Sequence, residues 1–266
     1  MKFKNIIYLL SIFFVSCDSI QETYYFIYFD SFIAHGGGAI EEFTLTNSLE
    51  AMNLSYEKGC RFLELDIITT SDGKFVAAHG WGDFKNMTNY YELSGTPLSE
   101  DVFMAQIIYD GFSPMNMDMI NKWFEDHPDA ILVTDKINNP KLFAEEFLFK
   151  DRLIMELFSW EAVDIAIEEG IKPMLSENLV ISVPDILDDI LQKEIEYVAI
   201  SKTFLLENRV LLKSLKDCGI MVYVYGLTER YDEVYFLENE MDYIYGMYID
   251  ETDILYHIDR IIVKRI

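Results

Sequence analysis

The chain has 266 residues, of which 51% are hydrophobic and 15% aromatic, enough for a sizeable core. Its 21 basic and 46 acidic residues give a formal net charge of −25. Nucleic-acid binding requires a basic surface, so this charge argues against that class of partner, and it also predicts repulsion from bulk anionic lipid. The sequence contains no Pro/Ser-rich linker and no repeat, and it gives no reason to infer a protein partner.

The first residues differ in character from the rest. Lys2 and Lys4 precede an apolar run over 6–16 that ends at Cys17. The run has the length of a signal-peptide core and is too short for a membrane-spanning helix, which needs ~20 residues. The cysteine resembles a bacterial lipoprotein cleavage site. We therefore expect a signal peptide over 1–17, a lipid anchor on Cys17, and a place in the cell envelope outside the cytoplasm. A plain signal peptide or a buried N-terminal strand is the alternative.

Residues 18–30 would then be a tether or N-terminal extension, and 31–266 would be the catalytic or binding domain. Strand-like and helix-like runs alternate from residue 31 onward, which is typical of βα units. Strands are predicted at 32–35, 61–68 (with an extension at 75–79), 130–136, 152–158, 173–176, 197–202, 221–225 and 243–248. Helices are predicted at 47–58, 115–125, 139–149, 160–169, 183–192, 207–218 and 231–240.

Residues 82–112 have little periodicity and are predicted to form a loop insertion over one end of the domain. The remaining pattern favours a single-domain α/β fold, a (β/α)8 TIM barrel. Spacing alone would also allow an open doubly wound sheet. The cysteines at 60 and 218 stand alone, which does not suggest a disulfide scaffold or a zinc site.

Two carboxylates lie two positions apart in the second predicted strand. Side chains alternate faces along a strand, so Glu64 and Asp66 should point to the same side. The rest of 62–68 is apolar, which predicts burial, and a buried unpaired carboxylate is costly. A divalent cation, Ca²⁺ or Mg²⁺, would offset both charges. Solvated edge positions are the alternative.

Two histidines flank this pair. His35 ends the first predicted strand and His79 ends the extension of the second. Parallel strands carry functional side chains where the strand ends and the loop begins. Because imidazole titrates near neutral pH, both histidines are candidates for proton transfer.

These residues belong to five blocks in a fixed order: His35-Gly-Gly37, Asn47-Ser-Leu-Glu-Ala51, Glu64-Leu-Asp66, Thr70-Ser-Asp-Gly73 and Val76-Ala-Ala-His-Gly80. The order and spacing resemble the glycerophosphodiester phosphodiesterase family, part of the phospholipase-C-like phosphodiesterase barrels. That family reads His-Arg-Gly, Asn-x-x-x-Ala, Glu-x-Asp, Thr-x-Asp-Gly and Val-x-x-His-Asp. Gly36 stands in place of an arginine that contacts phosphate, and Gly80 in place of a common aspartate. The first departure bears on phosphate binding and suggests a different substrate.

The resemblance implies a (β/α)8 barrel that hydrolyses a phosphodiester with a bound cation and a histidine acid/base pair. It also implies Asp135 as a third metal ligand and Lys136 as a phosphate contact. Adjacent residues face opposite sides of an ideal strand, so both can reach one site only at a bulge or strand end. A plain ion pair or a helix cap is the alternative for this pair. Asn47 would hold the His35 loop or cap the next helix.

Four further residues are candidate substrate contacts. Gly36 would let backbone amides approach phosphate, and a flexible turn is the alternative. Glu156 lies in the fourth predicted strand, Lys202 ends the sixth, and Tyr225 stands where the family often has a tryptophan. Ordinary barrel packing is the alternative for each of these last three residues.

The expected substrate is a small phosphodiester or a lipid-derived one, with glycerophosphodiesters as the family default. Lysophospholipid, inositol phosphate and glycan-linked phosphodiesters stay open, as do attack by water and formation of a cyclic intermediate. A non-catalytic cell-surface barrel that binds a phosphorylated ligand or glycan is the alternative function. The missing arginine motivates it, and the two histidines argue against it.

Overall fold

The computed structural model describes residues 29–88, 97–182, 186–227 and 230–251. Within these ranges, no helix combines the length and the apolar character needed to cross a bilayer. The expected signal peptide, the lipidation site Cys17 and the tether lie outside the described residues.

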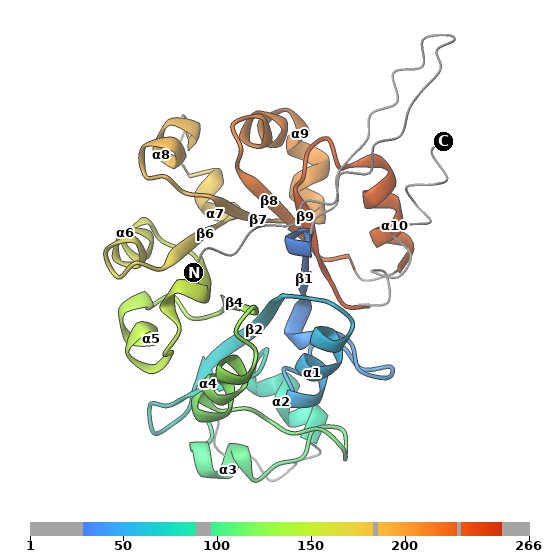
Figure 1. Cartoon of the computed structure of the whole chain (residues 1–266), viewed down its shortest axis with the longest axis vertical. Coiled ribbons are helices and arrows are strands. Elements are labelled where there is room, and N and C mark those ends of the chain that lie inside the picture. The colour runs from blue at the N-terminus through green and yellow to red at the C-terminus, as the bar shows by residue number, and fades with distance from the viewer. Residues whose placement is uncertain (1–28, 89–96, 183–185, 228–229, 252–266) are drawn as a thin grey trace, which may run out of the picture.

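In the described part of the chain, eight parallel strands close into a barrel, with the helices arranged around it (Figure 1). The strands are β1 (Phe32–Ala34), β2 (Phe62–Thr69), β4 (Ile131–Asp135), β5 (Leu153–Leu157), β6 (Lys172–Ser176), β7 (Tyr197–Ser201), β8 (Met221–Tyr225) and β9 (Gly246–Ile249). They pair in this order, and β9 pairs with β1 to close the ring. Strand β3 (Phe75–Ala77) adds an antiparallel hairpin to the end of β2. The closed ring confirms the (β/α)8 prediction and excludes the open sheet.

The helices largely follow the predicted pattern. They are α1 (Leu49–Glu57), α2 (Trp81–Thr88), α3 (Glu100–Met104), α4 (Met117–Asp126), α5 (Pro140–Glu146), α6 (Trp160–Glu168), α7 (Glu177–Val180), α8 (Ile186–Gln192), α9 (Lys202–Asp217) and α10 (Arg230–Asn239), with 3₁₀ turns η1 (Phe29–Ser31), η2 (His35–Gly37) and η3 (Lys150–Arg152). Side-chain caps fix several starts. Ser201 accepts a hydrogen bond from the amide of Phe204, so α9 begins at Lys202 rather than at the predicted residue 207.

Alternation along the strands divides the core into two layers. One face of each strand packs on the helices in a large cluster that includes Leu63, Leu65 and Leu132. The other face fills the barrel interior with a smaller cluster: Ile33, Phe62, Val133, Ile154, Met174, Tyr197, Ala199, Tyr223 and Tyr248. Because side chains repeat every two positions, the residues that follow these interior positions by two point to the carboxyl end of the barrel.

The insertion has more regular structure than its sequence indicates. Helices α2 and α3 fall within or beside 82–112, so the prediction of a loop there was wrong for these segments. Their apolar side chains form a third cluster with Val76 of β3, in which the rings of Phe84 and Phe103 stack with centroids 4.2 Å apart. Short helices with few apolar positions give a weak periodic signal, which explains the error.

Candidate active site

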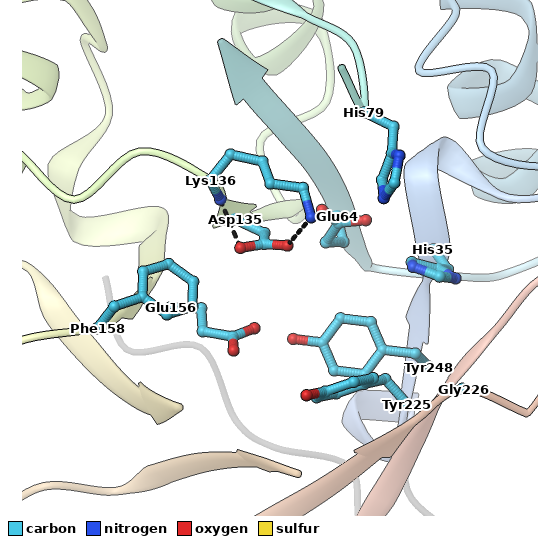
Figure 2. A pocket seen from close by; sticks show the side chains of 10 residues that line it. All are labelled: His35, Glu64, His79, Asp135, Lys136, Glu156, Phe158, Tyr225, Gly226 and Tyr248. Atoms are coloured by element: carbon cyan, nitrogen blue, oxygen red, sulfur yellow. Dashed lines mark hydrogen bonds and ion pairs between the residues drawn. The ribbon is translucent and has the colours of Figure 1, made fainter. Parts of the chain in front are cut away.

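A cavity of about 490 Å³ lies at the carboxyl end of the barrel (Figure 2). Its lining is His35, Glu64, His79, Asp135, Lys136, Glu156, Phe158, Tyr225, Gly226 and Tyr248. Several of these residues follow a barrel-interior residue by two positions: His35 follows Ile33, Glu64 follows Phe62, and Asp135 follows Val133. Strand alternation therefore carries residues that are distant in the sequence to one cavity.

Glu64 is almost fully buried and has one hydrogen-bond partner. The amide of Gly36 donates to its Oε2 at 2.6 Å, whereas Oε1 is buried without a partner. Burial raises the pKa of Glu64 well above its ordinary value, and the charges of Asp66 and Asp135 add to this rise. A buried oxygen without a donor, next to two further acids, matches the chemistry of a cation ligand.

Asp66 is held in place by Asn47. The Asn47 side-chain amide donates to Asp66 Oδ2 at 2.9 Å, and its Oδ1 accepts from the Asp66 backbone amide at 2.9 Å. The Asn47 backbone amide also donates to the carbonyl of Gly36, so this residue ties the His35 loop to β2. Ser48, not Asn47, caps α1 through its hydroxyl. Of the two roles considered for Asn47, the structure shows the first.

The backbone of Lys136 explains how two adjacent residues reach one site. Lys136 has a left-handed backbone, with φ of 67°, directly after β4 ends at Asp135. Its ammonium lies 2.9 Å from Asp135 Oδ2 and 3.5 Å from Asp66 Oδ1. Partial burial lowers the pKa of Lys136, but the hydrogen bond to Asp135 and the surrounding carboxylates raise it overall. Because the strand ends at Asp135, the side chains of Asp135 and Lys136 need not face opposite sides. Of the two possibilities considered, a bulge and a strand end, the structure shows the strand end.

The acids have separate partners in this arrangement. Among the described residues, no three His, Cys, Asp or Glu side chains are grouped closely enough to form a ready-made cation site. The Lys136 ammonium lies against Asp135 and Asp66, and Gly36 and Asn47 engage Glu64 and Asp66. A cation bound by these acids would share or displace the lysine contact.

Each histidine is paired with an aspartate that the sequence reasoning missed. His35 Nδ1 lies 3.0 Å from Asp250 Oδ1, at the end of β9. His79 Nδ1 lies 2.7 Å from Asp83 Oδ2, in the first turn of α2. Asp250 follows the interior residue Tyr248 by two positions, a signal that could have revealed it. Asp83 provides a carboxylate close to the position where Gly80 departs from the family pattern.

Glu156 and a group of aromatic rings form the wall of the cavity away from His79 (Figure 2). Burial, and then the charge of Asp135, raises the pKa of Glu156 well above its ordinary value, although Lys136 opposes the rise. Tyr225, Tyr248 and Phe158 lie near this carboxylate. The sequence reasoning selected Glu156 and Tyr225 and missed the other two aromatic residues.

Two candidate substrate contacts do not line the cavity. Lys202 begins α9, and its ammonium lies 2.7 Å from Asp232 Oδ1 of α10, so its charge is directed to that helix. The Gly36 amide is used by Glu64. Gly36 has φ of 54°, and a Cβ there would lie 2.6 Å from the Cα of Leu45. An arginine at this position would require the loop to move, which gives a physical reason for the departure from His-Arg-Gly.

Comparison with known proteins gives a consistent result. The model of the glycerophosphoryl diester phosphodiesterase family matches residues 37–250. No curated protein matches the chain.

The fold is similar to several solved structures. A glycerophosphodiester phosphodiesterase from Parabacteroides distasonis is 15% identical, with a TM-score of 0.65 over 88% of this chain and 97% of that one. One from Thermotoga maritima is 19% identical, with a TM-score of 0.61 over 89% and 100%. A phosphodiesterase from Oleispira antarctica, solved with the product sn-glycerol-3-phosphate, is 15% identical, with a TM-score of 0.65 over 86% and 96%. Because the family model matches most of its length, the chain belongs to the glycerophosphoryl diester phosphodiesterase family, whose members are phosphoric diester hydrolases.

Proposed function

We propose that this enzyme hydrolyses a small glycerophosphodiester-like substrate by histidine acid–base catalysis with a divalent cation. The observation that carries the proposal is the convergence of His35 and His79 on one cavity that also contains Glu64 and Asp135. The solved relative from Oleispira antarctica that contains sn-glycerol-3-phosphate supports a substrate of this size.

The aspartates support a proton-transfer role for both histidines. When Nδ1 of each ring donates to its aspartate, Nε2 is left to exchange a proton with the substrate. One histidine takes a proton from the nucleophile, and the other gives a proton to the leaving alkoxide. Asp250 and Asp83 hold the two rings in orientation.

Glu64, Asp66 and Asp135 are the proposed cation ligands. The partnerless Oε1 of Glu64 and the two neighbouring acids suit Ca²⁺ or Mg²⁺, which prefer oxygen ligands. When bound, such a cation offsets charge that develops on the phosphate oxygens. Lys136 supplies a fixed positive charge on the same side of the cavity, where it would contact a phosphate oxygen.

Removal of the cation tests this function directly. We expect hydrolysis of glycerophosphoglycerol to fall to background in excess chelator and to return when Mg²⁺ or Ca²⁺ is added. Full activity in chelator would contradict the cation role. Binding of glycerol-3-phosphate without turnover of any diester, at any cation concentration, would instead favour a non-catalytic ligand-binding barrel.

For location, we infer that the mature chain begins at a lipidated Cys17 and is anchored in the cell envelope. The basic start, the short apolar run and the cysteine support this proposal. Cys17→Ser should abolish lipid labelling and membrane fractionation and leave hydrolysis unchanged. Recovery of the wild-type chain in the cytosol with Met1 attached would contradict the proposal.

A further inference from the structure

We propose that Asn138 is a positioning residue: it fastens the loop that carries Lys136 to the loop that carries Phe158, and so holds the Lys136 ammonium toward the substrate phosphate. This inference rests on the proposed function, in which Lys136 contacts a phosphate oxygen. It adds a residue that lies outside the cavity lining.

The first observation is the backbone of Lys136. Its φ of 67° lies in the left-handed region, which is unfavourable for residues with a Cβ atom and persists only where neighbouring contacts hold it. On the β4 side, the amide of Lys136 donates to Asp135 Oδ1, and the amide of Ile137 donates to the Asp135 carbonyl at 2.9 Å. These contacts fix the start of the loop, and its far end needs a restraint of its own.

The second observation is a pair of hydrogen bonds at that far end. Asn138 Oδ1 accepts from the amide of Phe158 at 3.0 Å, and Asn138 Nδ2 donates to the hydroxyl of Ser159 at 3.1 Å. Because β4 and β5 are neighbours in the barrel, both bonds cross from the loop after one strand to the loop after the next. They set the spacing between Lys136 and Phe158, which both line the cavity (Figure 2).

The third observation is that the loop after β5 is itself anchored. The Ser159 hydroxyl also accepts from the amide of Ala162 at 3.3 Å and caps α6. Ile137, which lies between Lys136 and Asn138, packs against the main core cluster. Asn138 therefore joins the lysine loop to well-held structure, although Asn138 itself is exposed.

The backbone conformation of Lys136 decides where its side chain points. In an extended conformation, Lys136 would lie on the face of the strand opposite to Asp135, away from the cavity. The left-handed conformation instead places its ammonium 2.9 Å from Asp135 Oδ2, in the cavity lining. Loss of the Asn138 bonds would remove a restraint on this unfavourable conformation, so the lysine should occupy the cavity for a smaller fraction of the time.

Affinity for a phosphate monoester tests this role without relying on turnover. The probe is glycerol-3-phosphate, titrated by calorimetry in the presence of Mg²⁺. We expect Asn138→Ala to weaken binding by roughly 3–10-fold, because a smaller fraction of the protein would have the lysine in place. With glycerophosphoglycerol as substrate, KM should rise by a similar factor and kcat should change by less than about 2-fold, since the restraint acts on binding.

A double-mutant cycle separates positioning from general loop stability. Lys136→Met should weaken glycerol-3-phosphate binding by itself, because it removes the ammonium. If Asn138 acts through the lysine, adding Asn138→Ala to Lys136→Met should weaken binding by less than about 2-fold further. A structural role that does not involve the lysine would produce the same loss in both backgrounds.

Asn139 provides a matched control in the same loop. It is also an exposed asparagine, and its Oδ1 accepts from the amide of Leu142 at 3.1 Å, which caps α5. Asn139→Ala should lower the Tm at least as much as Asn138→Ala, because it removes a helix cap. It should leave the affinity for glycerol-3-phosphate unchanged, because its side chain bonds to α5 rather than to the loop after β5.

Three results would overturn the inference. Wild-type affinity in Asn138→Ala would show that the loop holds the lysine without this side chain. Equal losses from Asn138→Ala in the presence and absence of Lys136 would show that Asn138 acts by another route. Wild-type affinity in Lys136→Met would leave no phosphate contact to position. Failure of the proposed function gives a different result, a protein that hydrolyses no diester, and calorimetry would still measure the effect of Asn138 on phosphate binding.

Discussion

The two histidine–aspartate pairs are built in different ways. His35 and Asp250 are 215 positions apart in the sequence and meet because β1 and β9 are adjacent in the closed barrel. His79 and Asp83 are four positions apart and lie where β3 leads into α2. The first pair is less exposed, with 28% and 19% of the side chains accessible, compared with 38% and 52% for the second.

This difference indicates how firmly each imidazole is held. The parallel ladder of the barrel positions His35, and the ring of Tyr248 packs against its imidazole edge-to-face, with centroids 5.7 Å apart. His79 depends on a short helix and on the small cluster around Phe84 and Phe103. Regions with few buried contacts open more readily than barrel cores, so we expect the His79 side to be the more adaptable part of the site.

Removal of either imidazole should have the largest effect. His35→Ala and His79→Ala should each lower turnover by roughly 10²–10⁴-fold, because each deletes a proposed proton-transfer group. Rates should be measured on a diester with an unactivated leaving alcohol, since a good leaving group hides loss of the general acid. Circular dichroism would check that both variants fold. A near-wild-type rate in one variant would remove that histidine from the mechanism.

Replacing the aspartates should sharpen the comparison. Asp250→Asn should lower kcat by about 10–100-fold, the usual cost of losing an outer partner of a functional histidine. Asp83→Asn should cost less, about 3–10-fold, because this pair is more exposed and solvent can replace the carboxylate. The pH dependence of kcat should change in both variants, which a purely structural role would not produce. Equal losses, or a larger loss in Asp83→Asn, would contradict the proposed difference between the two pairs.

The smallest expected effect is on stability and concerns Glu233, a buried acid of α10 that is close enough to Asp250 to be affected by its charge. Burial, followed by the charges of Asp250 and Glu251, raises the pKa of Glu233 to about 7. The folded state therefore retains a proton that the unfolded state releases. This contribution to stability is complete below the ordinary carboxyl pKa and is lost as the pH rises through about 7.

Thermal denaturation at pH 5.5 and pH 8 would measure this linkage. The Tm of the wild type should fall between these values by roughly 2–6 °C more than the Tm of Glu233→Gln, whose side chain cannot titrate. Other buried acids affect both proteins alike and cancel in the difference. Parallel pH dependence in the two proteins would show that Glu233 does not titrate in this range.

The sequence allowed the barrel and most of the cavity to be predicted because local patterns located the strands and helices and the family resemblance favoured a barrel over an open sheet. Apolar strands with alternating faces located Glu64 and Glu156, the spaced motif blocks located His35 and His79, and the family resemblance located Tyr225. Strand alternation alone did not decide whether the side chains of Asp135 and Lys136 could reach the same cavity, because that depends on the left-handed backbone of Lys136.

Contacts between distant segments could not be predicted in the same way. Asp250 becomes the partner of His35 only when the first and last strands meet, and the charge of Lys202 is taken up by Asp232 of another helix. The use of the Gly36 amide by Glu64 depends on how the first loop folds over β2. Single-sequence patterns contain no information on such pairings.

The seam between β1 and β9 also has a consequence for how the chain folds. Only three register pairs join these strands, and Gly246 packs so closely on Ser31 that a Cβ there would lie 2.1 Å from its carbonyl oxygen. Contacts of such long sequence separation form slowly, because loop closure costs entropy before pairing returns any stability. Until β9 docks, β1 and β8 remain open strand edges, which are prone to pairing with other chains. Because docking also brings Asp250 to His35, the step that removes this risk of aggregation also completes the proposed acid–base site.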